Sequence, residues 1–269
     1  MSTILDTIAE YAVYRTERAK KNVPAADMRA MAEQISAEEC AAGNQRFRLT
    51  ESLKTGDITF ICECKKASPS KGLIAPDFPY LNIAKEYEEA GAGAISVLTE
   101  PKWFLGSNDY LKEIAANVSV PCLRKDFTVD EYMIYEAKTL GASAVLLICA
   151  ITDKGRLKEY INICDELGLS ALVEAHDEYE IEAALDAAAP IIGVNNRNLK
   201  DFTVDVHNSE RLRRLVPPEV LFVAESGIKT AADIDVLRKA NVNGVLIGET
   251  MMLSKDKKSM LNALRGSAF

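Results

Sequence analysis

Residues 144–174 read AVLLICAITDKGRLKEYINICDELGLSALVE. The uninterrupted aliphatic run AVLLI is followed by Asp153, a residue that suits the N-cap of a helix, and by an amphipathic segment over 153–167. Gly168 favours the left-handed turn that ends many helices, and the apolar run SALVE begins just beyond it. Strands that are apolar on both sides are buried on both faces, as in parallel sheets. This stretch therefore predicts a β–α–β unit.

The same alternation repeats along the chain from residue 58 to its end. We expect strands at 58–63, 94–98, 121–124, 144–148, 170–174, 191–194, 221–224 and 243–247. We expect helices at 81–90, 107–117, 130–140, 153–167, 177–188, 207–215, 230–239 and 256–265, with caps at Asp130, Asp153, Asp177 and Thr230 and turns at Gly91, Gly141 and Gly168. An open doubly wound sheet would show similar periodicity, but eight units in residues 58–269 favour a closed (β/α)8 TIM barrel of the α/β class.

The N-terminal region follows a helical pattern instead. Apolar residues recur at helical spacing over 4–21, and residues 26–45 predict a second helix that ends before the polar stretch from Glu51 to Asp57. So short a region rarely builds a core of its own. We therefore expect a single domain over residues 1–269, in which an N-terminal helical extension, 1–57, precedes the barrel, 58–269.

The overall composition is that of a globular protein, with 48% hydrophobic and 27% charged residues. The formal net charge of −8 argues against a nucleic-acid partner, which requires clustered Lys and Arg. The sequence contains no run of about 18 apolar residues that would predict a membrane span, and its N-terminus does not have the pattern of a signal peptide. We therefore expect a cytoplasmic protein without membrane contact. The six cysteines form no CxxC pair and are interpreted as reduced core residues: Cys40, Cys62, Cys64, Cys122, Cys149 and Cys164.

Charged and amide residues gather where the predicted strands end, and the active sites of such barrels lie at the carboxyl ends of the strands. Glu63 and Lys65 are two residues apart, so both should face the barrel mouth while Cys62 and Cys64 face the helices. A salt bridge on the surface would explain charged residues at a single strand end. Polar residues recur at further strand ends, which favours an active site instead: Lys125, Glu174, Asn195, Glu225 and Glu249.

Two of these residues are candidates for acid–base chemistry. Lys125 would act as a general acid if neighbouring cations lowered its pKa, although a solvated lysine is the plainer alternative. Glu174 ends an apolar strand, where a carboxylate is costly unless it is paired or used. His176 and His207 are the only histidines, and we interpret both as polar surface residues without a metal or nucleophile partner.

The turns after the last two strands each contain glycine, at Gly227 and Gly248. Backbone N–H groups in these two loops commonly bind phosphate in barrels. One glycine turn is weak evidence, but two at this pair of strands predict a phosphorylated small-molecule substrate.

At these positions the sequence resembles the indole-3-glycerol phosphate synthase family, and the resemblance spans essentially the whole chain. The matching segments are ECKKASPSKG (63–72), LTEPKWFLGS (98–107), LRKDF (123–127), LVEAH (172–176), GVNNRNL (193–199), VAESGI (223–228) and LIGETM (246–251).

The resemblance implies a carboxy-lyase that converts 1-(2-carboxyphenylamino)-1-deoxyribulose 5-phosphate into indole-3-glycerol phosphate, carbon dioxide and water in tryptophan biosynthesis. It implies no metal or organic cofactor, and we expect a monomer.

By resemblance, Lys125 is the general acid, Glu174 its acid–base partner and Lys65 the group that engages the substrate carboxylate, although the two lysines could exchange steps. Glu63, Asn195 and Glu225 would orient the substrate and the amines. The implied phosphate side comprises Ser68, Arg197, Ser226, Gly227, Gly248 and Thr250, and the apolar wall for the anthranilate ring comprises Phe104, Phe127, Leu146, Leu199 and Ile247.

Glu249 departs from the family pattern, in which serine is frequent beside the phosphate turn. A carboxylate at this position would repel the phosphate. We expect its side chain to turn away from the phosphate, leaving the backbone and Thr250 to bind. The loop 66–78, rich in Ser, Lys, Gly and Pro, is a candidate lid.

Three alternative functions are weighed against this one. A phosphoribosylanthranilate isomerase would move protons without losing carbon dioxide, and the set of Glu63, Lys65 and Lys125 does not suit it. An aldolase would use Lys125 as a Schiff-base nucleophile. A catalytically silent barrel is the third alternative, because a fold does not guarantee a function, but the charged residues at the expected strand ends argue against it.

Overall fold

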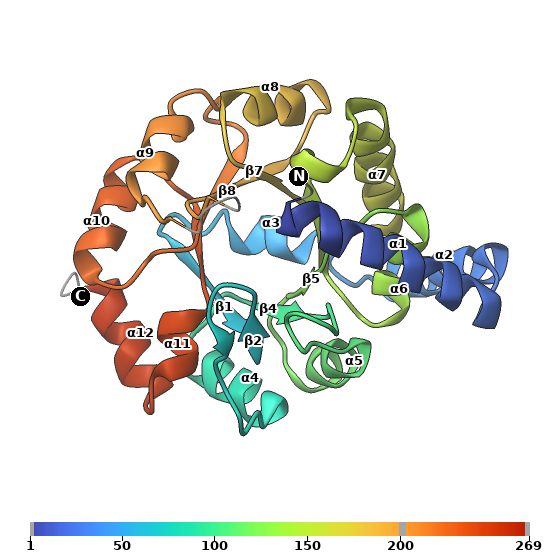
Figure 1. The fold of residues 1–269 in the computed structure, drawn as a ribbon, viewed down its shortest axis with the longest axis horizontal. Coiled ribbons are helices and arrows are strands. Elements are labelled where there is room, and N and C mark those ends of the chain that lie inside the picture. Colours follow the sequence, from blue (N-terminus) through green and yellow to red (C-terminus); the bar gives the residue numbers. More distant parts are fainter. Residues whose placement is uncertain (1–2, 199–202, 267–269) are drawn as a thin grey trace.

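The computed structural model describes residues 3–198 and 203–266. Parallel strands close into a barrel in the order β1-β10-β9-β8-β7-β6-β5-β4, which confirms the predicted (β/α)8 fold. Figure 1 shows the helices arranged as a ring around these strands. The barrel strands are β1 (Thr59–Cys64), β4 (Ala94–Leu98), β5 (Cys122–Lys125), β6 (Ala144–Ile148), β7 (Ser170–Ala175), β8 (Ile191–Asn195), β9 (Leu221–Glu225) and β10 (Gly244–Ile247).

The strand positions agree closely with those expected from the apolar runs. The predicted strands 94–98 and 144–148 match in full, the strands predicted at 58–63 and 121–124 lie one residue later, and the others differ by one residue at one end. The register places two polar strand ends side by side, because Asn195 of β8 pairs with Glu225 of β9. Parallel pairing thus brings residues from distant parts of the chain to one end of the barrel.

The outer helices also follow the expected order. They are α4 (Tyr80–Glu89), α5 (Asn108–Asn117), α6 (Glu131–Thr139), α7 (Lys154–Leu167), α8 (Glu178–Asp186), α9 (His207–Arg213), α10 (Ala231–Lys239) and α12 (Lys257–Arg265). The side chains of Asp130, Asp153, Asp177 and Thr230 accept hydrogen bonds from the first turns of their helices, as predicted. Short additional elements, the 3-10 turn η1 (Cys149–Ile151) and helix α11 (Glu249–Leu253), were not expected. In the described ranges, no helix has the length and apolarity needed to cross a membrane.

Apolar residues form two layers of core. One lies inside the barrel and includes Leu123, Leu172 and Val223, and the other lies between strands and helices. Cys62 and Cys64 belong to the outer layer, as the alternation along β1 predicted. The interpretation of all six cysteines as core residues is wrong for Cys40, which is exposed, and Cys149 is only half-buried. Cys40 lies in the last turn of a helix whose buried side chains, Met28 and Ala32, lie nearer its start.

The N-terminal region forms α1 (Ile4–Asn22), α2 (Ala25–Ala41) and α3 (Arg48–Ser52). The second predicted helix, 26–45, therefore ends four residues early. Helix α2 packs on the outside of the barrel against α6. Helix α1 lies at the mouth, where Ile4, Leu5 and Ile8 line a cavity.

Helix α3 closes the opposite end of the barrel, although its sequence predicts only a polar loop. Leu49 and Leu53 enter the inner core. Ser52 Oγ donates to the carbonyl of Gly93 at 2.8 Å, just before β4, and Thr50 N donates to Oγ of Ser170, the first residue of β7, at 3.1 Å. These contacts lie at the amino ends of the strands, which leaves the carboxyl ends open to ligands.

Candidate active site

A cavity of about 800 Å³ lies at the carboxyl ends of the strands. It brings together sixteen of the predicted site residues: Glu63, Lys65, Ser68, Phe104, Lys125, Phe127, Leu146, Glu174, Asn195, Arg197, Glu225, Ser226, Gly227, Ile247, Gly248 and Thr250. The remaining predicted residue, Leu199, lies outside the described residues.

The first ion pair of the cavity comes from β1 and the residue after it. Lys65 Nζ lies 2.5 Å from Glu63 Oε1, and the carboxylate is almost fully buried. Gly248 leaves room for this pair, because a Cβ at that position would lie 2.3 Å from Glu63 Oε1 and 2.8 Å from Lys65 Nζ. The chain therefore needs glycine here, and the pair faces the mouth as the strand alternation predicted.

Lys125 ends β5 and points between two carboxylates. Its Nζ lies 3.1 Å from Glu174 Oε2 and 3.5 Å from Glu225 Oε2. Its side chain is 15% exposed. Burial would lower the pKa of Lys125, but Glu174, Glu225 and Glu63 outweigh burial and raise it. The expected lowering by neighbouring cations is wrong, because carboxylates surround this amine, and Lys125 is protonated at neutral pH.

The two carboxylates beside Lys125 differ in acidity. Burial opposes ionisation of Glu174, but Lys125, His176 and a hydrogen bond from Asn195 lower its pKa below the ordinary value. At Glu225, burial and the charges of Glu174 and Glu63 outweigh Lys125 and raise the pKa to about 8. Glu225 Oε1 is buried without a hydrogen-bond partner in the described part of the chain. The site thus holds one carboxylate that is ionised and one that tends to keep a proton.

The turns after β9 and β10 form another side of the cavity. Ser226 and Gly227 both adopt left-handed backbone, at φ 69° and 83°, and Asn196 Nδ2 donates to the carbonyl of Ser226 at 3.1 Å. Thr250 Oγ1 donates to the carbonyl of Ile228 at 2.9 Å, so this hydroxyl already fixes the two turns to each other. Successive backbone N–H groups in such turns form a concave surface suited to anions.

Basic side chains also line this side, including Lys71 and Lys229, which sequence reasoning did not select. Glu249 lines the cavity as well, and its Oε1 lies 3.1 Å from Lys71 Nζ. Lys71 can therefore neutralise the charge of Glu249. The expectation that the Glu249 side chain turns away from a bound phosphate stays a prediction.

The opposite part of the cavity is apolar. The rings of Phe104 and Phe127 lie 6.0 Å apart between centroids at 43°, and Leu146 and Ile247 line the same space. Glu100 fixes the loop that carries Phe104, because its carboxylate accepts N–H bonds from residues 102–104 at 2.7 to 2.9 Å. Sequence reasoning missed the apolar residues that α1 adds. Their helical spacing was visible, but their docking over the mouth was not.

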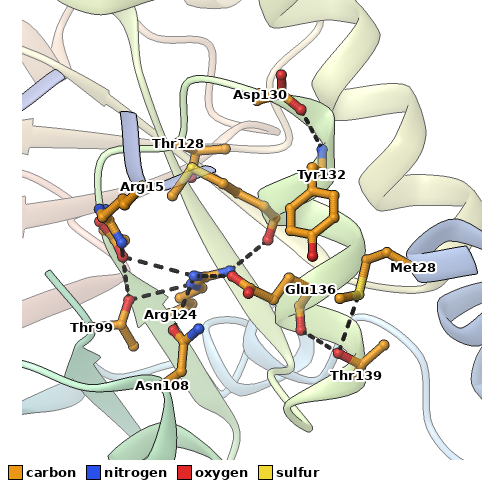
Figure 2. Close-up of polar contacts among 12 residues, drawn as sticks. Arg15, Met28, Thr99, Asn108, Arg124, Thr128, Asp130, Tyr132, Glu136 and Thr139 are labelled. Atoms are coloured by element: carbon orange, nitrogen blue, oxygen red, sulfur yellow. Dashed lines mark hydrogen bonds and ion pairs between the residues drawn. The ribbon is translucent and has the colours of Figure 1, made fainter. Parts of the chain in front are cut away.

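A buried ionic network anchors α1 beside Lys125. Both terminal guanidinium nitrogens of Arg15, Nη1 and Nη2, donate to the Asp126 carboxylate, with Nη1 to Oδ2 at 3.1 Å. Thr99 Oγ1 donates to the same carboxylate at 2.5 Å. Figure 2 shows Arg124 between Thr99, Asn108 and Glu136; its Nη2 lies 2.6 Å from Glu136 Oε2. The network therefore connects the helix over the mouth to the strand that carries Lys125.

The two histidines differ in their surroundings. His207 is a surface residue as expected, with a side chain that is 76% exposed. The same interpretation of His176 is wrong, because its side chain is 18% exposed and its Nε2 lies 3.5 Å from Glu174 Oε1. It follows β7 directly and is held by Glu180 of α8. The signal was its place two residues after Glu174, on the same side of an extended strand.

The predicted lid loop, 66–78, contains a two-stranded hairpin of β2 (Ala67–Ser68) and β3 (Gly72–Leu73). Ser68, Pro69, Ser70, Lys71 and Ile74 line the cavity. Its mobility stays a prediction. In the described residues, no group of three or more His, Cys, Asp or Glu side chains is arranged to hold a metal ion.

Comparison with solved structures identifies relatives in fold. A 3-hexulose-6-phosphate synthase from Salmonella typhimurium superposes with a TM-score of 0.64 at 12% identity, covering 77% of this chain and 96% of that chain. A thiamine phosphate pyrophosphorylase from Pyrococcus furiosus gives a TM-score of 0.58 at 16% identity, covering 81% and 96%. At such identities the likeness shows the barrel fold alone.

Comparison of sequences is more specific. The chain is 56% identical over 265 residues to the indole-3-glycerol phosphate synthase of Ruminiclostridium cellulolyticum, covering 98% of this chain and all of that one. It is 48% identical over 267 residues to the enzyme of that name from Lachnoclostridium phytofermentans, covering 97% and 98%. The family model for indole-3-glycerol phosphate synthase matches residues 5–264. The chain therefore belongs to the indole-3-glycerol phosphate synthase family.

Proposed function

We propose that this chain is a carboxy-lyase that closes the indole ring of indole-3-glycerol phosphate. Its substrate would be 1-(2-carboxyphenylamino)-1-deoxyribulose 5-phosphate, and carbon dioxide and water would leave. Family membership supports the reaction. The observation that carries the chemical assignment is a protonated Lys125 between Glu174 and Glu225, at the edge of an apolar wall.

The first step needs a proton donor. The ring carbon that bears the carboxylate attacks the ribulose carbonyl, and the carbonyl oxygen must accept a proton as the carbon–carbon bond forms. Lys125 would supply this proton. A Schiff base would require the neutral amine as nucleophile, whereas carboxylates keep Lys125 charged. The geometry therefore favours acid catalysis over the aldolase alternative.

Loss of carbon dioxide then restores the aromatic ring. Lys65 would hold the substrate carboxylate before it leaves, and Glu63, 2.5 Å away, would orient the amine. Glu174 would serve as the acid–base partner when the hydroxyl departs as water, and Asn195 and Glu225 would orient Lys125 and Glu174. The two lysines could still exchange steps.

The two ends of the cavity suit the two ends of the substrate. Phe104, Phe127, Leu146 and Ile247 would pack against the anthranilate ring, a role also predicted for Leu199. The phosphate would bind at Ser68, Arg197, Ser226, Gly227, Gly248 and Thr250. Binding energy from this remote group would help to orient the reacting atoms.

The test is formation of the fluorescent indole product by the parent, by Lys125→Ala and by the control Lys158→Ala, an exposed lysine of α7. We expect Lys125→Ala to lose about 10²- to 10⁴-fold in kcat, the usual contribution of a general acid. Lys158→Ala should match the parent. A folded parent that forms no indole product would refute the function, and full activity in Lys125→Ala would refute the role of Lys125.

The remaining expectations follow from the same substrate. We propose that the protein acts on this small molecule as a cytoplasmic monomer, without nucleic-acid or membrane partners. The acidic net charge of −8 supports the absence of a nucleic-acid partner. Gel filtration with light scattering would test the monomer.

A further inference from the structure

His176 lies on the side of Glu174 that does not face Lys125. Glu174 Oε2 contacts Lys125 Nζ at 3.1 Å, while Glu174 Oε1 lies 3.5 Å from His176 Nε2. The carboxylate is thus placed between an amine and an imidazole, one at each oxygen. Rotation of the carboxylate would break both contacts together.

Both the ring and the backbone of His176 are held by neighbouring helices. Nδ1 lies 3.0 Å from Glu180 Oε2, which also accepts the backbone N–H of His176 at 2.8 Å. The carbonyl of His176 accepts from Asn208 Nδ2 of α9 at 3.2 Å. Glu180 lies in the first turn of α8, capped by Asp177. Glu180 therefore holds the ring through Nδ1, and contacts from α8 and α9 hold the backbone of His176.

Nε2 of His176 is buried and has no hydrogen-bond partner among the described residues. A neutral ring bonded through Nδ1–H to Glu180 would turn the Nε2 lone pair toward Glu174 Oε1, and two acceptors would face each other. The imidazolium would present N–H to each carboxylate instead. An arrangement with a carboxylate at each nitrogen favours the charged ring.

The charges around the ring come from several elements. Glu180 (α8), Glu174 (β7) and Glu225 (β9) act on the ring. Lys125 (β5) contacts Glu174, and the thiol of Cys149 (η1) donates to the carbonyl of Glu180. Burial would lower the pKa of His176, but the hydrogen bond with Glu180 and the charges of Glu174, Glu180 and Glu225 raise it above the ordinary 6.5.

A charge count supports a third cation at the site. When Glu225 keeps its proton, the carboxylates of Glu63 and Glu174 are balanced by the amines of Lys65 and Lys125. Glu180 adds a third carboxylate, 3.0 Å from Nδ1 of His176, and a protonated His176 would balance its charge.

We propose that His176 is a positioning residue for the ring-closing reaction: its protonated ring holds Oε1 of Glu174, so that Oε2 stays on Lys125 and Glu174 stays ionised until it accepts a proton. This inference rests on the proposed function. It assigns no contact between His176 and the substrate, because the ring is not among the residues that line the cavity.

The proposal predicts a specific pH dependence. The folded-state pKa of His176 is raised above its ordinary value of 6.5. The ring therefore stays charged when the pH equals that ordinary pKa, and it loses its proton only at higher pH. Above that point Glu174 loses its partner, and kcat should fall. Glutamine at position 176 would keep an N–H donor near the place of Nε2 but could not titrate, whereas asparagine is too short to reach Glu174.

The kinetic test compares kcat and KM across pH for the parent, His176→Gln, His176→Asn and the control His207→Asn. We expect His176→Asn to lose about tenfold in kcat, the lower range for a hydrogen bond to a charged group, with KM little changed. His176→Gln should keep most of the activity and lose the part of the alkaline decline that comes from His176, leaving any part that comes from Glu225, whose pKa is about 8. His207→Asn should match the parent.

Two kinetic outcomes would overturn the proposal. One is a parent-like kcat and pH profile in His176→Asn. The other is an equal loss in both His176 variants with an unchanged alkaline decline, which would show a purely structural role.

A second readout does not depend on turnover. Imidazole NMR signals of the two histidines, assigned with His207→Asn, would be titrated in the parent and in Glu174→Gln. We expect Glu174→Gln to lower the pKa of His176 and leave that of His207 unchanged; an unchanged pKa of His176 would overturn the proposal. A parent that forms no indole product but shows this coupling would refute the function and leave the His176–Glu174 pair standing.

Discussion

Replacing Arg15 with glutamine removes the main cation that faces the buried carboxylate of Asp126. The Asp126 side chain has no exposed surface and that of Arg15 is 18% exposed, so solvent screens this pair poorly. Burial opposes ionisation of Asp126, and Arg15 and Arg124 lower its pKa nonetheless. Arg124 alone, with Nη2 3.9 Å from Asp126 Oδ2, is a weaker partner because it is also engaged by Glu136.

The expected cost follows from these contacts. Removing one partner of a buried ion pair costs about 3 to 5 kcal/mol, and because Arg124 and Thr99 remain we expect about 3 kcal/mol in Arg15→Gln. Arg18→Gln on the same helix is the matched control, since Arg18 is exposed. An exposed charge should contribute about 1 kcal/mol or less.

The sole tryptophan provides the assay. Trp103 packs edge-on against Tyr11 of α1, with 5.5 Å between ring centroids, so its fluorescence reports the docking of α1. Urea titrations followed by this signal, with circular dichroism for the barrel, would give the free energy of unfolding for each variant. A loss in Arg15→Gln no larger than that in Arg18→Gln would refute the reasoning that this network anchors α1.

Two further predictions concern the site itself. The raised pKa of Glu225, about 8, means that the folded protein keeps a proton that the unfolded chain releases near 4.5, so this group makes stability fall as pH rises between these values. Unfolding titrations of Glu225→Gln across that range should show less decline than the parent, and parallel curves would contradict the assignment. Gly248→Ala would force Glu63 and Lys65 apart and should lower kcat/KM by about 10²-fold, as misplacement of reacting groups does. Gly155→Ala in α7, whose Cβ would lie 3.3 Å from Asp153 Oδ1, is its control, and equal kinetics for the two variants would exclude the close approach as the reason for glycine.

The sequence predicted the barrel because its evidence is local. Apolar runs such as AVLLI, caps such as Asp153 and turns such as Gly168 each act within a few residues. The same holds for the polar residues at the strand ends, such as Glu63, Lys125 and Glu174, because the carboxyl end of a strand can be located once the strand is known. The apolar wall was predicted from the family resemblance alone.

Features that depend on distant contacts were not predicted. The only apolar residues that could have indicated helix α3 are Leu49 and Leu53. Both are buried by the strands around them, which the local sequence does not reveal. The shift in the pKa of Lys125 was predicted in the wrong direction, because the carboxylates that raise it come from other strands. His176 is buried by groups of α8 and α9 that its own segment does not reveal.

Other expectations stay predictions. They include the division of the chain at residue 57, the mobility of the loop 66–78 and the orientation of Glu249 toward a bound phosphate. The individual catalytic and binding roles stay predictions as well, because the cavity places the residues together without assigning their steps.

The most direct measurement is a mass balance on substrate carrying a labelled aryl carboxylate. Ring closure with decarboxylation predicts one labelled carbon dioxide for each indole-3-glycerol phosphate formed by the parent. A product that keeps the label would contradict the account and favour an isomerase, and substrate that is left unchanged by folded protein would favour a silent barrel.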